Sequence, residues 1–425
     1  MDRFEWRPWV LVAAFSLVLF LITAGTYNAL GVVLPAMVKD ERWSWTEAGF
    51  GYTLLGGATG LSSFLPSALI QRFGVRIALL CGTAVMAAGF LCLAEAHGAL
   101  VYFVGAALCG VGYQMLALIP GTYVLAAVFK HRALPFGVYF TSAALGGVAG
   151  PFMVFGIMRA FHDQWRVFWL AQMLGAIAVG LICAAITPRT AELARDSQAT
   201  DAALAEETRS PGRHRVYRTP IDWTPGAAFR TPQFYVLLAA YFGHLLIGST
   251  VASVSVAHLT QRGVATVTAG SLLSLEALMQ MAGRTLGGLV GDLIDPRYLM
   301  IAALAFLAVG SAALSVARDY PTMLVYAVGS GLGFGLALLS VTVLLLNYYG
   351  RAHNLEIFST TCLIGAVSAL GPTIAGVLRD ATGSFGSTFQ IFAVVIAMIL
   401  AAALFMRPPR SAAAAARDAE ARPVG

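Results

Sequence analysis

Two charged residues lie deep inside one apolar stretch of the chain. Glu276 and Arg284 both fall within residues 267–290, whereas the other charged residues lie at the ends of such stretches or between them. Charged side chains inside a membrane are costly, so they usually face a cavity or a partner and mark a functional site. The guanidinium of an arginine stays charged in proteins, and its planar shape matches a carboxylate with two parallel hydrogen bonds. The sequence therefore predicts that Arg284 binds the carboxylate of a solute; the alternative is that it only bridges helices through backbone carbonyls.

Three polar residues share one face of the same predicted helix. Glu276, Gln280 and Arg284 follow one another at intervals of four residues. In an α-helix this spacing keeps them within a stripe roughly 80° wide and places the first about 12 Å from the last. A carboxyl group buried in such a place can exchange a proton near neutral pH. We therefore expect Glu276 to couple transport to protons and Gln280 to lie beside the ligand; alternatively, Glu276 reaches the headgroups or bonds a neighbouring helix.

Five further polar residues are candidates at the same depth. His244 is a second candidate for proton coupling because an imidazole titrates near neutral pH, although a lone histidine of this kind can also serve as an interhelical hydrogen-bonding group. Tyr27 and Asn28 interrupt the first apolar stretch, and Tyr113 and Gln114 follow closely spaced glycines in the fourth. These four can bind the carboxylate or a hydroxyl of a ligand, but they can equally serve helix packing.

The count of buried cations limits the charge of the ligand. No second lysine or arginine accompanies Arg284 inside an apolar stretch. A dicarboxylate would leave one negative charge without compensation in a medium of low polarity. The sequence therefore favours a small monocarboxylate of the lactate or pyruvate type. It also favours symport with a proton over exchange, because a candidate acid is present; the alternative is a carboxylate or organic-anion antiporter, or an exporter.

The composition excludes several classes of protein. Hydrophobic residues make up 58% of the 425 residues and charged residues only 11%, whereas soluble domains carry roughly 25% charged residues. A soluble enzyme and a nucleic-acid-binding protein are both excluded by this balance. The five cysteines lie in apolar stretches without a CxxC pair, so we expect neither a metal nor another cofactor. No HExxH motif, GxSxG motif or pair of buried carboxylates indicates catalysis, and we expect no enzyme activity.

Twelve apolar stretches are each long enough to cross a bilayer, which requires about 20 residues. They cover residues 9–37, 47–70, 76–96, 100–128, 134–158, 166–187, 232–259, 267–290, 298–317, 320–349, 356–378 and 386–406. The predicted fold is an all-α membrane protein with twelve transmembrane helices in two six-helix halves related by a pseudo-two-fold axis. The predicted halves are residues 1–187 and 232–410, with a cytoplasmic linker at 188–231 and a disordered cytoplasmic tail at 411–425.

The distribution of lysine and arginine predicts the orientation. If both termini face the cytoplasm, 19 of these residues lie on the cytoplasmic side and 7 on the other. Cytoplasmic loops carry the excess of positive charge in membrane proteins. We therefore expect a multi-pass protein of the inner (cytoplasmic) membrane with both termini inside; its partners would be lipid, protons and a small organic monoanion, and its expected form is a monomer.

Two short loops at equivalent places in the halves share a pattern. The positions concerned are Ser67, Gln71, Arg72, Gly74 and Arg76 after the second stretch, and Gly288, Asp292 and Arg297 after the eighth. They partly match the pattern G-x-L-x-D-R-x-G-R, and through them the chain resembles the major facilitator superfamily over nearly its whole length. This resemblance implies a transporter with its solute site between the halves, near the middle of the membrane.

Four segments narrow the resemblance to one branch. Residues 43–47 (WSWTE), 230–234 (RTPQF), 283–284 (GR) and 380–384 (DATGS) are similar to segments of bacterial monocarboxylate transporters and oxalate:formate antiporters. The resemblance implies that Arg284, at the position of the arginine in the eighth helix, binds the substrate carboxylate. The chain departs from that group in two places. Gln280 stands where monocarboxylate transporters often have an aspartate, and residues 360–362 (TTC) stand where the antiporters have a lysine, which argues against a dianionic substrate.

Overall fold

The computed structural model describes residues 6–129, 133–162, 164–189, 217, 219, 222–290, 294–350 and 353–409. These residues form helices joined by short loops, and none of them lies in a strand. The linker predicted at 188–231 falls largely outside the described residues, and the tail predicted at 411–425 falls entirely outside them. Asp292 of the second loop pattern also lies outside them.

The helices of the amino-terminal half correspond to the first six predicted stretches. They are α1 (Trp6–Thr23), η1 (Ala24–Asn28), α2 (Ala29–Glu41), α3 (Trp45–Leu61), α4 (Phe64–Phe73), α5 (Val75–Ala94), α6 (Ala99–Gly112), η2 (Tyr113–Leu118), α7 (Ile119–Val128), α8 (Ala133–Ala160) and α9 (Trp165–Ile186). The segments α1, η1 and α2 continue one another as a single rod, and so do α6, η2 and α7.

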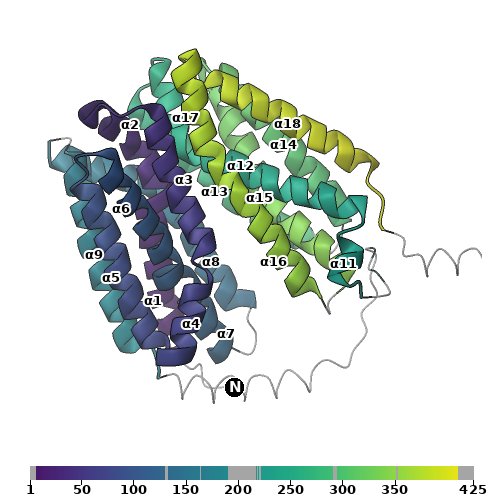
Figure 1. Ribbon diagram of the computed structural model, residues 1–425, viewed down its shortest axis with the longest axis horizontal. Helices are drawn as coiled ribbons and strands as arrows, with labels where there is room; N and C mark the ends of the chain where they lie inside the picture. The colour runs from purple at the N-terminus through teal and green to yellow at the C-terminus, as the bar shows by residue number, and fades with distance from the viewer. Residues whose placement is uncertain are drawn as a thin grey trace, which may run out of the picture.

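The helices of the carboxy-terminal half correspond to the other six stretches. They are α12 (Pro232–Gln261), α13 (Thr266–Val290), α14 (Pro296–Val316), α15 (Tyr320–Tyr349), α16 (Asn354–Gly365), η3 (Ala366–Leu370), α17 (Gly371–Thr382) and α18 (Gly386–Phe405), preceded by the short α11 (Pro225–Ala228). The two groups of helices stand side by side, α1–α9 in purple to blue and α12–α18 in teal to yellow (Figure 1).

Most of these rods are apolar enough to cross a bilayer on their own. Ten pass a test of length and mean hydropathy, and α3 with α4 forms an eleventh that bends by 45°. The twelfth rod, α13, is less apolar because it carries Glu276, Gln280 and Arg284. The polarity of α13 therefore reflects the site it holds.

Local sequence signals fix where several helices begin and end. Ser44 and Glu47 form a capping box at the start of α3, in which each side chain binds the backbone N–H of the other residue. This arrangement satisfies donors that the first turn of a helix leaves free. Gly350 ends α15 with φ at 86°, a conformation that residues with a Cβ rarely adopt.

Two rods contain a π-helical turn near the middle of the membrane. The turns are η1 in the first rod and η2 in the fourth. Such turns are rare and are often found at functional sites. The residue pattern did not indicate them, although the polar candidates Tyr27, Asn28, Tyr113 and Gln114 all lie in these turns.

The two halves meet mainly where α2 packs on α12, α8 on α13, and α3 on α17 and η3. We call the end of the bundle at residues 42–44 the first-loop end, and the opposite end, where α1 begins, the terminal end. Backbones approach closely near the first-loop end. A Cβ added at Gly31 would lie 1.8 Å from the carbonyl oxygen of Ala252, and one at Gly376 would lie 2.2 Å from that of Trp45.

All hydrogen bonds between the halves, within the described part of the chain, lie toward the first-loop end. The carboxylate of Asp380 accepts hydrogen bonds from the backbone N–H groups of Trp45 (3.2 Å) and Thr46 (2.9 Å), and from the Thr46 hydroxyl (2.5 Å). Two turns further into α3, the Thr53 hydroxyl donates to the carbonyl oxygen of Ala369 at 2.6 Å. The structure is therefore closed by specific bonds at the first-loop end.

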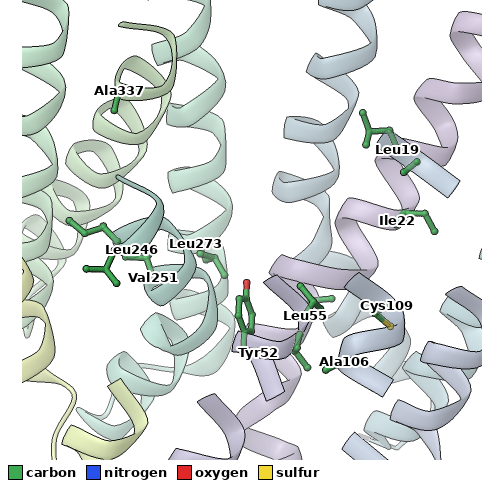
Figure 2. Close-up of a cluster of buried hydrophobic side chains, with 14 of the residues drawn as sticks. Leu19, Ile22, Tyr52, Leu55, Ala106, Cys109, Leu246, Val251, Leu273 and Ala337 are labelled. Carbon is green, nitrogen blue, oxygen red and sulfur yellow. The ribbon is translucent and has the colours of Figure 1, made fainter. Parts of the chain in front are cut away.

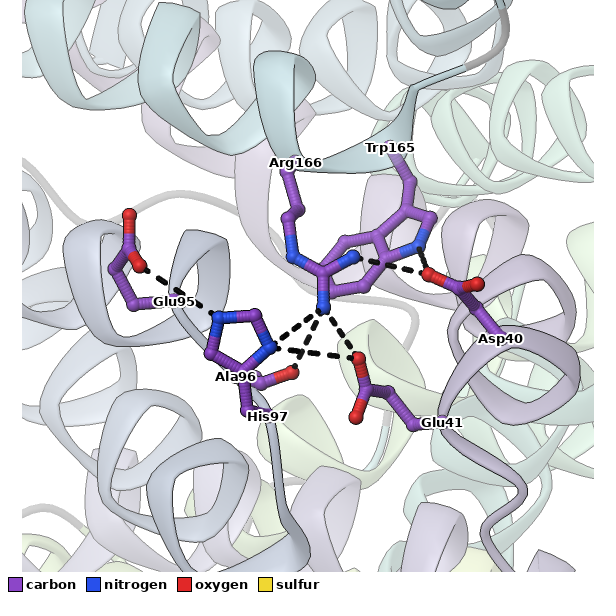
Figure 3. Close-up of polar contacts among 7 residues, drawn as sticks. All are labelled: Asp40, Glu41, Glu95, Ala96, His97, Trp165 and Arg166. Atoms are coloured by element: carbon purple, nitrogen blue, oxygen red, sulfur yellow. Dashed lines mark hydrogen bonds and ion pairs between the residues drawn. The ribbon is translucent and has the colours of Figure 1, made fainter.

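A cluster around Arg166 ties three helix ends of the amino-terminal half together (Figure 3). The guanidinium of Arg166 binds Asp40 at 2.9 Å, forms an ion pair with Glu41 and stacks on Trp165, whose ring centre is 4.1 Å away. The Trp165 indole N–H donates to the same carboxylate of Asp40 at 3.1 Å. Because both terminal nitrogens of the guanidinium bind residues of the amino-terminal half, this arginine serves the fold.

The apolar core runs through both halves (Figure 2). Leu19 and Leu55 represent it in the amino-terminal half, and Leu246 and Leu273 in the carboxy-terminal half. Tyr52 lies where the two groups approach each other and is 1% exposed. A tyrosine in this position brings a hydroxyl to the boundary between the halves.

Candidate substrate and proton site

The polar stripe of α13 forms as the spacing of its residues predicts. The amide nitrogen of Gln280 donates hydrogen bonds to both carboxylate oxygens of Glu276, at 2.8 and 2.9 Å. Glu276 is only 2% exposed, whereas Gln280 and Arg284 are half-buried. Among the described residues no ion pair joins Glu276 to Arg284. The carboxylate and the guanidinium are thus held on one face but are not locked to each other.

Glycines of α15 determine how closely that helix approaches the stripe. A Cβ added at Gly331 would lie 2.3 Å from the carbonyl oxygen of Glu276, and one at Gly335 would lie 2.3 Å from that of Gln280. Both contacts are with backbone, which cannot move aside as a flexible side chain can. Small residues at these positions therefore let the two helices pack tightly and fix the position of the stripe.

The guanidinium of Arg284 has unused hydrogen-bond donors. Its Nε is buried and has no hydrogen-bond partner in the described part of the chain, and none of its nitrogens forms a hydrogen bond there with another residue. Its guanidinium carbon lies 5.8 Å from the ring centre of Phe334, a cation–π contact. It also interacts electrostatically with Tyr113 of the opposite half. A buried cation without hydrogen bonds is costly. A carboxylate bound here would supply the hydrogen-bond acceptors and the negative charge that the protein does not.

The two π-helical turns bring Tyr27 and Tyr113 together. The rings of Tyr27 and Tyr113 meet edge to face, with centres 5.4 Å apart. The hydroxyl of Tyr27 forms a hydrogen bond with that of Thr59 at 2.7 Å, and the hydroxyl of Tyr113 forms a longer one with that of Thr23 at 3.4 Å. Both tyrosines are half-buried. The amino-terminal half therefore presents two phenol groups held in place by hydroxyls, and that of Tyr113 interacts with Arg284.

Asn28 and Gln114 occupy different surroundings. The amide nitrogen of Asn28 donates to the carbonyl oxygen of Gly147 on α8 at 3.2 Å. A Cβ on Gly147 would also touch Ala277 of α13, at 3.3 Å, so Asn28 lies near the contact between the halves. Gln114 is 7% exposed, and its carbonyl oxygen has no partner within the described residues.

His244 packs against two aromatic rings, those of Phe334 and Tyr241. It is fully buried, and its ring centre is 5.2 Å from that of Phe334 and 5.0 Å from that of Tyr241. Its Nδ1 lies 3.4 Å from the carbonyl oxygen of Ala240, and its Nε2 has no partner in the described part. Phe334 therefore contacts both His244 and Arg284.

Sequence reasoning missed three residues of this region. Tyr52 donates a hydrogen bond from its hydroxyl to the backbone carbonyl of Tyr27 at 3.0 Å and interacts electrostatically with Glu276. Phe334 contacts Arg284, and Thr59 binds Tyr27. The phenol of Tyr52 inside an apolar stretch could have indicated a site residue from the sequence. Phe334 could not, because its sequence context does not distinguish it from an ordinary core residue.

No cluster of metal-ligating side chains is present among the residues that the structure describes, and the five cysteines are unpaired. The polar groups of the site are instead one guanidinium, one carboxyl, amides and phenols. This set suits an organic anion and a proton.

Comparisons with known proteins agree on one family. The model of the Major Facilitator Superfamily matches residues 15–284, more than half of the chain. Monocarboxylate transporter 2 of Meriones unguiculatus is 30% identical over 142 residues, which are 32% of this chain and 29% of that protein. The MFS-type transporter TOXA of Cochliobolus carbonum is 31% identical over 144 residues, 32% of this chain and 25% of that protein. The chain thus spans less than a third of the length of these relatives.

Solved structures share the fold along almost the whole chain. One is a bacterial homolog of the human lysosomal transporter Spinster in an inward-facing and occupied conformation, with a TM-score of 0.69 at 16% identity, covering 95% of this chain and 97% of the other. Another is a mutant of the nucleoside transporter NupG, with a TM-score of 0.72 at 11% identity, covering 93% and 99%.

Proposed function

The chain belongs to the major facilitator superfamily, and we propose that this multi-pass membrane transporter carries a small monocarboxylate, of the lactate or pyruvate type, together with a proton. The observation that carries the proposal is the guanidinium of Arg284. It lies inside the bundle, has no hydrogen-bond partner among the described residues and faces Tyr113 of the opposite half. A carboxylate fits such a group with two charge-assisted hydrogen bonds.

The charge of the site supports a monoanion. Within α13 the charged residues are Glu276 and Arg284, and Glu276 is already held by Gln280. One carboxylate balances one guanidinium, whereas a second would remain uncompensated in a region of low polarity. The similarity to Monocarboxylate transporter 2 supports the same class of solute.

The position of the site between the halves supports alternating access. Arg284 belongs to the carboxy-terminal half and Tyr113 to the amino-terminal half. A carboxylate that binds both would draw the halves together and neutralise the cation, which lowers the cost of enclosing it. We propose that residues 1–187 and 232–410 move against each other across the linker at 188–231. We assign the terminal end to the cytoplasm of the inner membrane, which the excess of lysine and arginine there supports.

Glu276 is the proposed proton carrier. It lies next to the boundary between the halves, where Tyr52 interacts with it, and it is free of an ion pair with Arg284. A carboxylate that is buried away from water and forms no ion pair favours its neutral form. Its carboxyl group can therefore load and release a proton as the halves rearrange.

Transport by proteoliposomes tests the proposal. Wild-type protein should accumulate labelled lactate or pyruvate when the outside is made acidic, and Glu276→Gln should lose this net uptake while it still exchanges labelled for unlabelled solute. Glu95→Gln, which changes an exposed carboxylate at the first-loop end, is the matched control and should transport as the wild type does. Undiminished pH-driven uptake by Glu276→Gln would remove Glu276 from the mechanism.

Exchange or export of an organic anion is the second candidate function, because the unpartnered guanidinium of Arg284 suits any such anion. The same vesicles separate the two functions. Flux that strictly requires solute inside the vesicle, and that a pH gradient does not drive, would identify an exchanger and contradict proton symport.

A further inference from the structure

Of the seven buried hydroxyl groups in the carboxy-terminal half that lack a partner in the described part of the chain, five lie toward the first-loop end on α12, α13, α14 and α15. Each belongs to a residue that is no more than 3% exposed. They are the hydroxyls of Ser255 on α12, Ser274 on α13, Ser311 on α14, and Tyr326 and Ser330 on α15. Buried polar groups without partners are rare because each one is costly, and ordered water usually satisfies them. Their occurrence on four neighbouring helices therefore points to water inside this half.

The five hydroxyls lie at one level of the membrane. Each is five to ten residues from the end of its helix at the first-loop end, and Glu276 is ten residues from the start of α13. At 1.5 Å per residue, this places all of them about 8 to 15 Å below that end. They therefore form a polar layer at the depth of Glu276, on the side where hydrogen bonds close the passage between the halves.

Tyr326 connects this layer to Glu276. Its hydroxyl interacts electrostatically with the carboxyl group of Glu276 and lies close to the hydroxyl of Ser255. Close packing of α15 on α13 at Gly331 brings the two helices together at this point. On its other side the carboxyl group is covered by the amide of Gln280.

A polar track continues from Ser255 to the surface at the first-loop end. Ser255 and His258 of α12 and Arg262, directly after the end of that helix, follow one another at intervals of three and four residues. The Nε2 of His258 lies 2.9 Å from the carbonyl oxygen of Leu314, and Arg262 donates to that of Ala317 at 3.0 Å. Polar groups are thus spaced along α12 from the loop down to the buried layer.

We infer that a chain of ordered water between α12, α14 and α15, bound by Ser255 and Tyr326, relays protons between the first-loop end and Glu276. This inference rests on the proposed coupling role of Glu276. Each water in the chain accepts one proton and passes one on, and the last proton forms the neutral carboxylic acid of Glu276. The proton route then runs inside one half, whereas the carboxylate moves between the halves.

The charged and titratable groups along this route come from several helices. Arg284 and Tyr52 interact with Glu276 from its own helix and from α3, and His258 and Arg262 line the outer part on α12. Tyr326 belongs to α15. The relay requires only the hydroxyl groups of Tyr326 and Ser255, which can each accept and donate a hydrogen bond.

Removing these hydroxyls tests the relay with little change of volume. The variants are Tyr326→Phe, Ser255→Ala and their combination, in the same proteoliposomes. In the double variant we expect pH-driven net uptake to fall by a factor of ten or more, while the rate of solute exchange and the KM stay within a factor of two. The control is Tyr348→Phe, which removes another buried hydroxyl without a described partner from the other end of α15; its net uptake should not change.

The outcomes separate the relay from the proposed function. If Glu276→Gln loses net uptake but the double variant transports as the wild type does, the relay is wrong and the coupling role of Glu276 stands. If Glu276→Gln keeps net uptake, the coupling role is wrong, and so is the relay. A double variant that loses exchange together with net uptake would show a structural role and would also overturn the relay.

Discussion

Asp380 joins the two halves at the first-loop end, and its replacement by alanine should open that end more often. Its carboxylate, near the end of α17, accepts three hydrogen bonds from the first turn of α3. The capping box of Ser44 and Glu47 remains in place when the halves separate, because both residues belong to the amino-terminal half. The bonds to Asp380 are therefore made in the closed arrangement alone.

The structure sets the size of the effect. A side chain that caps a helix contributes about 0.5–2 kcal/mol, and a negative charge at a helix start adds about 0.3–1 kcal/mol. Asp380 is exposed, so water screens the charge and the lower part of each range applies. We expect Asp380→Ala to weaken closure by about 1–2 kcal/mol, which is a factor of roughly 5–30 in the equilibrium between closed and open. Asp380→Asn keeps an acceptor and should show a smaller shift.

Accessibility of a single cysteine measures this equilibrium. Gly56→Cys places a thiol on α3 below the closure, where a Cβ fits at an ordinary 3.4 Å from Ala369, in a background whose five native cysteines are replaced. A membrane-impermeant thiol reagent added from the first-loop side should label it faster, by that factor of roughly 5–30, once Asp380→Ala is introduced.

Asp319→Asn is the matched control. Asp319 is also an exposed aspartate at the first-loop end, but it binds Thr322 of its own half at 2.5 Å. Labelling in this variant should match that of the unmodified background. Equal labelling with and without Asp380→Ala would refute the reasoning that these bonds hold the halves closed.

Three further predictions concern packing and binding. In Gly331→Val the new Cβ would lie 2.3 Å from a main-chain oxygen of α13. Thermal unfolding should therefore show a loss of stability of about 1–3 kcal/mol. Gly57→Ala, whose Cβ would meet nothing within 4 Å, should leave the stability unchanged. Arg166→Ala leaves two carboxylates without their cation, and since the arginine is 30% exposed we expect a screened loss of about 1–2 kcal/mol; an unchanged melting temperature would show that the cluster contributes nothing. Tyr27→Phe removes the hydroxyl proposed to bind the ligand; loss of one such hydrogen bond, about 1 kcal/mol, should weaken substrate binding roughly fivefold in titrations, and unchanged binding would place Tyr27 outside the site.

The sequence was sufficient to predict the helices, because the hydrocarbon of a bilayer demands long apolar stretches with all backbone groups bonded internally. The stretch predicted at 320–349 is α15, and that predicted at 267–290 is α13 with one residue added at its start. The contact between Glu276 and Gln280 was also predictable, since residues four apart share a face of a helix. Contacts between side chains of one helix follow from the spacing of the residues and do not depend on the tertiary structure.

Features that depend on contacts between helices were not predictable. The π-helical turn η1 shifts the hydrogen bonds of one turn, and Tyr52 of another helix binds the carbonyl oxygen of Tyr27 there. Nothing in the residues 24–28 encodes that partner. In the same way, Tyr113 and Arg284 lie 171 positions apart in the chain, and only the packing of the two halves shows that they face each other. The bonds of Asp380 to α3 cross between the halves for the same reason.

Binding of small acids to wild-type protein and to Arg284→Ala tests the central claim most directly. Thermal unfolding with a panel of mono- and dicarboxylates should show stabilisation of the wild type by monocarboxylates. Removing one partner of a buried charged pair typically costs about 2–5 kcal/mol, so Arg284→Ala should bind the same acids at least about 30-fold more weakly. Equal stabilisation of both proteins by the same acids would contradict a site built around this guanidinium.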